Sequence, residues 1–308
     1  MMKSEMADSA GPSGSTCDGT EPIELIMKMA QELEELELEN KKTDNELLLG
    51  KLERAEREHE RLLSELKEAK RLHKLLMTNG HERPEDDSCP ICDLPFPHDA
   101  SLWMYWPCCM KKMCKGCVLK SYKHGIDDCP FCRGKQPKDK GQFIAMVQKR
   151  ADTGDPEAIC YLGAVYREGR YGLKADNAMA KKMLTKAAEL GVKFAHLLLG
   201  QIYYCEGESA KMHKHWVAAA ISGDVYARHQ LGCMDYDDEN YGRAVQHWKI
   251  SAKMGLEGSL NAIKDLFLKG HATKMDYAEA LRGYQSAAEE MKSPERREAS
   301  LLPAGDWF

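Results

Sequence analysis

Apolar residues recur at intervals of three and four positions along residues 21–78, in a segment otherwise made of Glu, Lys, Arg and Leu. This spacing places them on one side of an α-helix. One frame comprises Ile26, Met29, Leu33, Leu36, Asn40, Thr43 and Leu47. A second comprises Leu48, Leu52, Ala55, His59, Leu62, Leu66, Ala69, His73 and Leu76. The heptad spacing predicts a coiled coil, because an isolated helix would leave this seam in water.

The partner of this helix is most simply a second copy of the chain, so the sequence predicts a homodimer. Asn40 falls on the seam, where a polar residue tends to fix register and strand number. The two frames meet near residues 47–50, where their phase slips. A charged single helix and a helix folded back on the rest of the chain are the alternatives.

A pattern of small and bulky residues repeats along residues 151–290. A pattern that begins at Ala151 starts again at Ala188, Ala220 and Ala252, so the starts lie 37, 32 and 32 residues apart. Each unit is interpreted as a helix hairpin in which Ala and Gly allow close approach. The bulky positions in register are Leu184, Trp216, Trp248 and Tyr284. One hairpin cannot bury its apolar face alone, so the pattern predicts an α-solenoid.

Eight of the 12 cysteines are concentrated in one short segment. They are Cys89, Cys92, Cys108, Cys109, Cys114, Cys117, Cys129 and Cys132. Each CxxC pair can present two thiolates to one tetrahedral zinc ion at about 2.3 Å, so eight predict two Zn²⁺ sites. A zinc ion held by four thiolates is structural, and we predict no catalytic residue. The adjacent pair Cys108 and Cys109 is the exception in spacing, and His124 or His98 is the alternative ligand for one of them.

Composition narrows the class of protein further. The chain has 308 residues and a net charge of -5, which gives no general attraction to nucleic acid or acidic lipid. It shows neither a signal-peptide core near its start nor a run of about eighteen apolar residues, so we expect no membrane partner. Clustered cysteines without a secretory signal favour metal binding over disulfides. We therefore expect a cytoplasmic protein, with the nucleus as an open alternative.

The expected fold is mainly α: a long N-terminal coiled-coil helix, a small two-zinc cysteine module and a C-terminal α-solenoid of helix hairpins. The boundaries follow from shifts in composition. We expect a disordered tail at 1–20, the coiled coil at 21–78, a linker at 79–87 and the cysteine module at 88–135. A second linker is expected at 136–142, the solenoid at 143–292 and a flexible tail at 293–308.

The repeated units resemble the Sel-one-like repeat (SLR), a relative of the tetratricopeptide repeat. The stretch LGAVYREGRYGLKADNAMAKKMLTKAAELG carries nearly the whole consensus, and the resemblance covers about half of the chain. SLR arrays in general bind proteins along a concave surface. The resemblance therefore implies that a protein substrate or partner binds the solenoid.

The cysteine module resembles a RING finger in which cysteine fills all eight ligand positions. The resemblance implies a cross-brace, with the first and third cysteine pairs on one zinc and the second and fourth on the other. It also implies contacts from Ile91, Pro130 and Arg133 to a ubiquitin-conjugating enzyme. The implied function is a RING-type ubiquitin ligase that acts without a covalent intermediate. A non-enzymatic zinc-binding scaffold is the alternative, because every module has a binding explanation.

Overall fold

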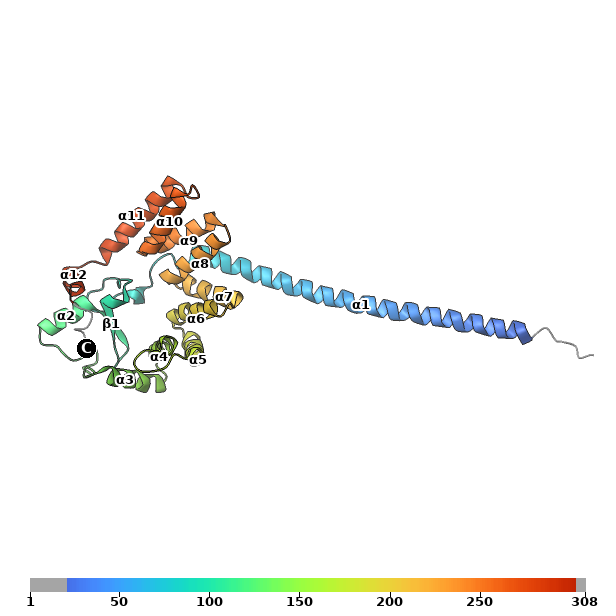
Figure 1. The fold of residues 1–308 in the computed structure, drawn as a ribbon, viewed down its shortest axis with the longest axis horizontal. Coiled ribbons are helices and arrows are strands. Elements are labelled where there is room, and N and C mark those ends of the chain that lie inside the picture. Colours follow the sequence, from blue (N-terminus) through green and yellow to red (C-terminus); the bar gives the residue numbers. More distant parts are fainter. Residues whose placement is uncertain (1–20, 303–308) are drawn as a thin grey trace, which may run out of the picture. The chain divides into compact units, whose positions relative to one another are not determined.

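The computed structural model describes residues 21–302 (Figure 1). They divide between Lys70 and Arg71 into two units. Cys17, Trp307 and Phe308 lie outside the described residues. The fold is mainly helical, as the sequence predicts, with one long N-terminal helix, a small cysteine module and a solenoid of helix hairpins. No helix among the described residues is both long enough and apolar enough to cross a membrane.

Helix α1 (Glu21–Thr78) confirms the single long helix expected over this segment. In the first unit its apolar seam is open to solvent: the side chains of Leu33, Leu52 and Leu66 are between 50% and 60% exposed. In the second unit the last turns of α1 are covered by the solenoid. Leu76 is buried there in a cluster with Leu197 and Trp216. Leu76 is therefore not available to a coiled-coil partner. The last part of the second heptad frame instead agrees with the alternative expectation, a helix folded back on the rest of the chain.

The solenoid consists of nine helices between residues 140 and 290. They are α3 (Lys140–Asp152), α4 (Pro156–Glu168), α5 (Asn177–Glu189), α6 (Lys193–Cys205), α7 (Ser209–Ile221), α8 (Val225–Asp237), α9 (Tyr241–Lys253), α10 (Glu257–Leu268) and α11 (Lys274–Glu290). Helices α4 and α5, α6 and α7, and α8 and α9 form tight hairpins. A Cβ on Gly163 would lie 2.7 Å from Cγ of Leu184, and a Cβ on Gly232 would lie 2.5 Å from Nε1 of Trp248. A Cβ on Gly200 would press on Trp216 in the same way. The repeated glycines therefore set the distance between paired helices.

A second set of repeated glycines forms the turns between hairpins. Gly154, Gly191, Gly223 and Gly255 have φ angles between 86° and 96°, a conformation that strains residues with a side chain. We name the row of turns at Gly191, Gly223 and Gly255 the glycine edge. Their spacing of 32 residues in the chain makes them equivalent positions of successive units.

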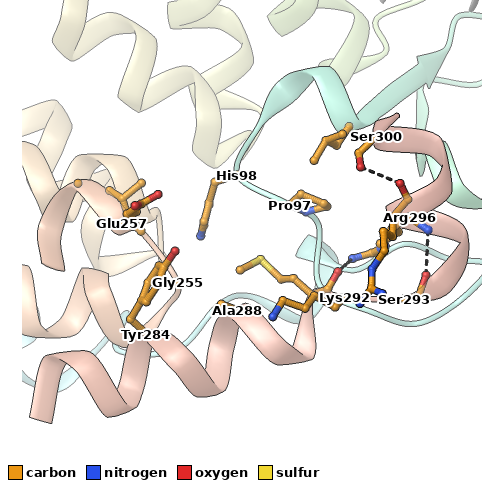
Figure 2. A pocket seen from close by; sticks show the side chains of 15 residues that line it. Pro97, His98, Gly255, Glu257, Tyr284, Ala288, Lys292, Ser293, Arg296 and Ser300 are labelled. Carbon is orange, nitrogen blue, oxygen red and sulfur yellow. Dashed lines mark hydrogen bonds between the residues drawn. The ribbon is translucent and has the colours of Figure 1, made fainter. Parts of the chain in front are cut away.

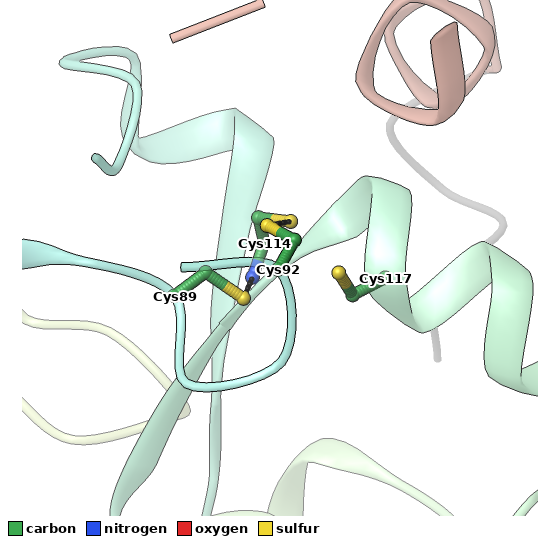
Figure 3. A group of neighbouring side chains, drawn as sticks. All are labelled: Cys89, Cys92, Cys114 and Cys117. Atoms are coloured by element: carbon green, nitrogen blue, oxygen red, sulfur yellow. Dashed lines mark hydrogen bonds between the residues drawn. The ribbon is translucent and has the colours of Figure 1, made fainter. Parts of the chain in front are cut away.

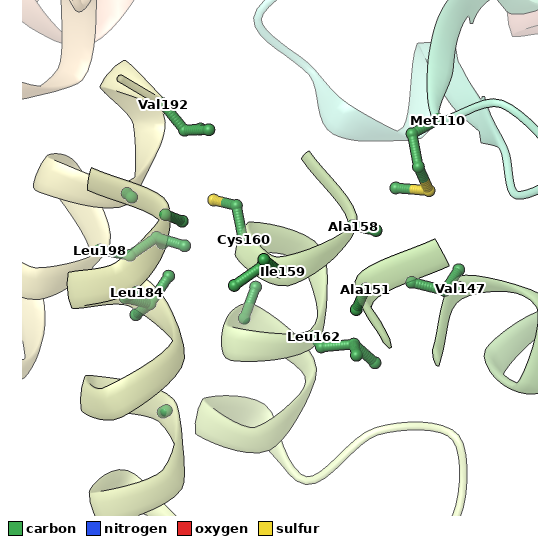
Figure 4. Packing of buried hydrophobic residues seen from close by; sticks show 14 of the residues in the cluster. Met110, Val147, Ala151, Ala158, Ile159, Cys160, Leu162, Leu184, Val192 and Leu198 are labelled. Carbon is green, nitrogen blue, oxygen red and sulfur yellow. The ribbon is translucent and has the colours of Figure 1, made fainter. Parts of the chain in front are cut away.

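The cysteine module contains a two-stranded antiparallel sheet and one helix. Strands β1 (Trp103–Trp106) and β2 (Lys111–Cys114) pair in a register that places Trp103 opposite Cys114. Helix α2 (Lys115–Lys123) follows, and the 3-10 helices η1 (Glu85–Asp87) and η2 (Ala100–Leu102) lie on the N-terminal side. Met110, in the turn between the strands, is buried in the same cluster as Val147 and Ala151 of α3 (Figure 4).

Helix α12 (Pro294–Ser300) occupies part of the segment for which the sequence suggested a flexible tail. The Ser293 side chain accepts a hydrogen bond from the Arg296 backbone N–H, and Pro294 stands in the first turn. Both are standard helix-start signals. Ala299 of this helix is buried in the core of the cysteine module.

Candidate metal centre

Cys89, Cys92, Cys114 and Cys117 form the first group of thiols, which we call site one (Figure 3). Their sulfur atoms all lie within 4.8 Å of one another, and Sγ of Cys92 is 3.8 Å from Sγ of Cys114. The first two residues belong to one loop, Cys114 ends β2 and Cys117 is in α2. The hairpin and the helix thus bring together pairs that are far apart in sequence.

Cys108, Cys109, Cys129 and Cys132 form the second group, site two, with the same limit of 4.8 Å. Sγ of Cys109 lies 3.7 Å from Sγ of Cys129, and Sγ of Cys132 lies 3.3 Å from Sγ of Cys108. The two groups alternate along the chain, which is the cross-brace arrangement that the RING resemblance implies. The adjacent Cys108 and Cys109 both reach the same group.

The geometry of both groups fits a tetrahedral zinc ion. Four sulfurs at about 2.3 Å from a central ion stand about 3.8 Å from one another. The Cys92–Cys114 separation of 3.8 Å at site one and the Cys109–Cys129 separation of 3.7 Å at site two match this edge length, while the Cys108–Cys132 separation of 3.3 Å is shorter. Each group supplies four ligands, which would complete the coordination and leave no position for a reactive water. A metal held in this way would stabilise the fold and carry out no chemistry.

The two loops that carry the first and last CxxC pairs, Cys89–Cys92 and Cys129–Cys132, have a common backbone. The residue after each pair, Asp93 or Arg133, has a φ angle near 60°, and its N–H donates to the carbonyl oxygen of Cys89 or Cys129, respectively. The Cys114 N–H also points at Sγ of Cys89, at 3.5 Å. The hydrogen bonds to the carbonyl oxygens fix the shape of the loops, and the one to Sγ of Cys89 stabilises negative charge on that sulfur.

The ionisation of the thiols reflects their crowding. Hydrogen bonds from Cys114 and Cys117 lower the pKa of Cys92 to about 6. Burial raises the pKa of Cys109 to about 11. Like charges so close together cannot all form without a cation between them. The thiol groups therefore have the donor chemistry of a divalent metal site.

Gly134 allows site two to close. A Cβ on this residue would stand 2.8 Å from Cβ of Cys108 and 3.3 Å from Sγ of Cys132. The alternative histidine ligands lie elsewhere: Nε2 of His98 is 2.9 Å from the carbonyl oxygen of Met254, and His124 is exposed at the end of α2.

The three residues expected to contact a conjugating enzyme lie in the two CxxC loops. Ile91 is 50% exposed in the first loop. Pro130 is partly buried in the last loop, and Arg133, directly after Cys132, is exposed.

Helix α2 contacts α12. Lys120 and Lys123, the lysines of α2 that pair with α12, lie on the same helix face as Gly116.

The segment before and within the cysteine module runs along the glycine edge. Asp86 pairs with Lys193 beside the first turn, and a Cβ on Gly223 would stand 2.8 Å from the carbonyl oxygen of Glu82. His98 accepts a hydrogen bond at its carbonyl from the Tyr226 hydroxyl, at 2.8 Å. This edge of the solenoid is therefore occupied by the chain itself, including residues 79–87 for which the sequence suggested a linker.

Sequence reasoning missed one residue of the metal centre. Arg296 of α12 is 7% exposed, and its Nη2 donates to Sγ of Cys92 at 3.4 Å. The two residues are 204 positions apart, so no local pattern links them. The only available signal was the helix start at Ser293 and Pro294, which marks a structured segment.

No family model matches the chain. An uncharacterized protein of Neisseria meningitidis serogroup B is 27% identical over 167 residues, or 52% of this chain and 34% of that protein. The chain thus spans about a third of the length of this curated relative.

Two solved structures are similar in part. A protective antigen present in uropathogenic Escherichia coli strains, displaying an SLR fold, is 18% identical with a TM-score of 0.41, over 61% of this chain and 43% of that chain. A Sel1 repeat protein from Oxalobacter formigenes is 24% identical with a TM-score of 0.43, over 57% and 71% of the respective chains. The solenoid of this chain is established by its own helices and contacts.

Proposed function

We propose that this protein is a zinc-stabilised scaffold for protein–protein interactions. The observation that carries the proposal is the presence of two four-thiol groups, in each of which one pair of sulfurs stands at the edge length of a closed zinc site. A closed site has no position for a substrate, so the metal would serve folding. The remaining surfaces, on α1 and on the SLR-like solenoid, are then available for partners.

Metal analysis of the full chain tests this proposal. We expect about two zinc ions per chain after purification in zinc-containing buffer. Chelation should unfold the cysteine module and leave the helical signal of the solenoid largely intact, because the solenoid has apolar clusters of its own. A zinc content near zero would overturn the proposal.

A homodimer through α1 is part of this scaffold. Its support is the row of leucines on α1 that are at least half exposed, which a second copy would bury. Light scattering of the full chain should give twice the mass of 34.8 kDa. Leu52→Glu should shift it toward the monomer, whereas Arg57→Glu places the new carboxylate off the seam and should not. A monomeric wild type would contradict the dimer.

A second candidate function is a RING-type ubiquitin ligase. The observation that favours it is the exposure of Ile91 and Arg133 on the two CxxC loops, where the RING family contacts a ubiquitin-conjugating enzyme. The module would hold the charged enzyme in a reactive conformation, and a substrate lysine would attack the thioester directly. The gain in rate would come from positioning.

Self-ubiquitination with a panel of conjugating enzymes separates the two functions. Ile91→Ala and Arg133→Ala should abolish the activity of a ligase, while Ile126→Ala, which removes another exposed apolar side chain of the module, should retain it. If zinc-loaded wild type is inactive with the whole panel, the scaffold is the remaining function.

A further inference from the structure

Arg296 is a buried cation that has a cysteine thiol, and no carboxylate, among its described hydrogen-bond partners. Among the described residues its side chain makes four hydrogen bonds, three to carbonyl oxygens and one to a sulfur, and none to a carboxylate. A buried guanidinium without an anion nearby is costly. The negative group within its reach is site one, through Cys92. Four thiolates around Zn²⁺ carry about two negative charges, which would meet this need.

The same guanidinium also holds the loop that follows Cys92. Nη2 donates to the carbonyl oxygen of Leu94 at 3.0 Å, and Nη1 donates to that of Pro95 at 2.6 Å. Nη1 also donates to the carbonyl oxygen of Met291, at 2.8 Å, just before α12. One side chain therefore connects a ligand of site one, its loop and the start of α12.

Helix α12 packs on the cysteine module. A Cβ on Gly116 of α2 would stand 2.7 Å from the backbone nitrogen of Arg296, so the two helices meet at their backbones. Lys120 pairs with Glu295 and Lys123 with Glu298 along the same contact. On the side of α10 and α11, a cavity of about 470 Å³ opens beside α12 (Figure 2). Its wall includes Tyr284 and Met291.

We propose that Arg296 is a positioning residue of site one, and that metal at this site holds α12 in its docked place. The proposal rests on the proposed zinc function. The metal fixes the loop of Cys92, whose carbonyl groups and sulfur bind the guanidinium. Arg296 in turn offsets the charge of the thiolates and slows the loss of the metal. Site one thus joins α12 to the cysteine module. Among the described residues, no arginine of α12 donates to a ligand of site two in this way.

The first test uses the zinc-loaded wild-type full chain and amide hydrogen exchange. Removal of zinc with a chelator should raise exchange in residues 294–302 and leave exchange in α9 and α10 unchanged, because their apolar cluster contains no residue of the cysteine module. Unchanged exchange in residues 294–302 after complete zinc removal would overturn the proposal. This arm needs no variant and so does not depend on whether a substitution folds.

The second test follows zinc release to a coloured chelator. Arg296→Gln should release one of the two zinc ions roughly tenfold faster than wild type, a change typical of a lost partner of a metal ligand. Arg296→Lys, which keeps the charge, should restore part of the difference. Arg297→Gln alters the exposed neighbour and should behave as wild type.

The outcomes distinguish the role proposed for Arg296 from the proposed function as a zinc-stabilised scaffold. Wild type with no bound zinc overturns both. Wild type with two zinc ions and equal release rates in Arg296→Gln overturns the role of Arg296 and leaves the zinc sites standing. Faster release of both ions to the same extent also overturns it, because a general loss of stability would act on both sites.

Discussion

Arg228 of α8 donates a hydrogen bond from Nη1 to the carbonyl oxygen of Leu76 near the end of α1, at 2.8 Å. The side chain is completely buried, and Nη2 also donates to the carbonyl oxygens of Asn79 and Ala220. The last carbonyl groups of a helix have no partner within the helix. One arginine therefore caps the ends of both α1 and α7 and ties the last turns of α1 to the solenoid.

Replacing Arg228 should detach the end of α1. Arg228→Met keeps much of the apolar volume but leaves the carbonyl oxygen of Asn79 unpaired and that of Leu76 with only the His81 ring, whose Nε2 is 3.4 Å away. We expect a loss of about 2 kcal/mol in the free energy of unfolding, measured by denaturant titration. Arg282→Met changes an exposed arginine on α11 and should cost little. Equal effects of the two substitutions would contradict the capping role.

The close approach of paired helices gives a second prediction. A Cβ on Gly232 would stand 2.5 Å from Nε1 of Trp248, a rigid side chain that is 4% exposed. Gly232→Ala gains helix propensity but overpacks this contact, so we expect the free energy of unfolding to fall by about 1 to 2 kcal/mol. Denaturant titration measures the change.

A control and a rescue accompany this substitution. Gly242→Ala, also in a solenoid helix, meets nothing within 4 Å and should be neutral or stabilising. Adding Trp248→Phe to Gly232→Ala should recover part of the loss, because the smaller ring makes room. Purely additive effects of the two substitutions would show that the contact does not limit the approach of α8 and α9.

The sequence predicts those parts of the fold that depend on local periodicity. Gly163, Gly200 and Gly232 face bulky residues at the positions where the repeat aligns Leu184, Trp216 and Trp248, because one unit repeats the same packing. The long helix α1 likewise follows from its spacing of leucines. The grouping of the eight cysteines was implied by the RING resemblance, and the structure places their sulfurs in the same two groups.

The contacts that join the modules could not be predicted in this way. Arg228 and Leu76 are 152 positions apart, and Arg296 and Cys92 are 204 positions apart. An arginine in a helix is usually a solvated charge, and nothing in its neighbourhood along the chain marks it as buried. The covered glycine edge was missed for the same reason, since a polar segment before the cysteine module has the composition of a free linker.

Gly134 gives a prediction at site two. Because a Cβ there would press on Cβ and Sγ of Cys108, Gly134→Ala should displace this ligand. We expect zinc content to fall from about two ions per chain to about one, as measured by elemental analysis. Gly242→Ala is the control and should keep both ions, because its Cβ would meet nothing within 4 Å. Gly125 has open space around it, but its φ of 71° would itself strain an alanine.

His247 of α9 gives a prediction for pH. It is 3% exposed, and burial together with the nearby Arg228 and Arg243 lowers its pKa to about 3. Nε2 lies 3.4 Å from Oδ2 of Asp235, which would favour the charged ring. Arg243 already pairs with this carboxylate, with Nε 2.8 Å from Oδ1, so its charge is largely offset.

The direction follows from the protons bound in each state. Between about pH 6.5 and pH 3 the unfolded chain holds a proton on this histidine and the folded chain does not, so stability falls as the pH falls through this range. At pH 5 the effect of His247 amounts to about 2 kcal/mol. Denaturant titrations at pH 7.5 and pH 5 should show that wild type loses about this much more than His247→Gln. The other histidines and any loss of metal affect wild type and His247→Gln alike. Only the difference between their two losses of stability therefore reports on His247. Equal losses would mean that His247 is protonated in the folded protein at pH 5, and that Asp235 outweighs burial.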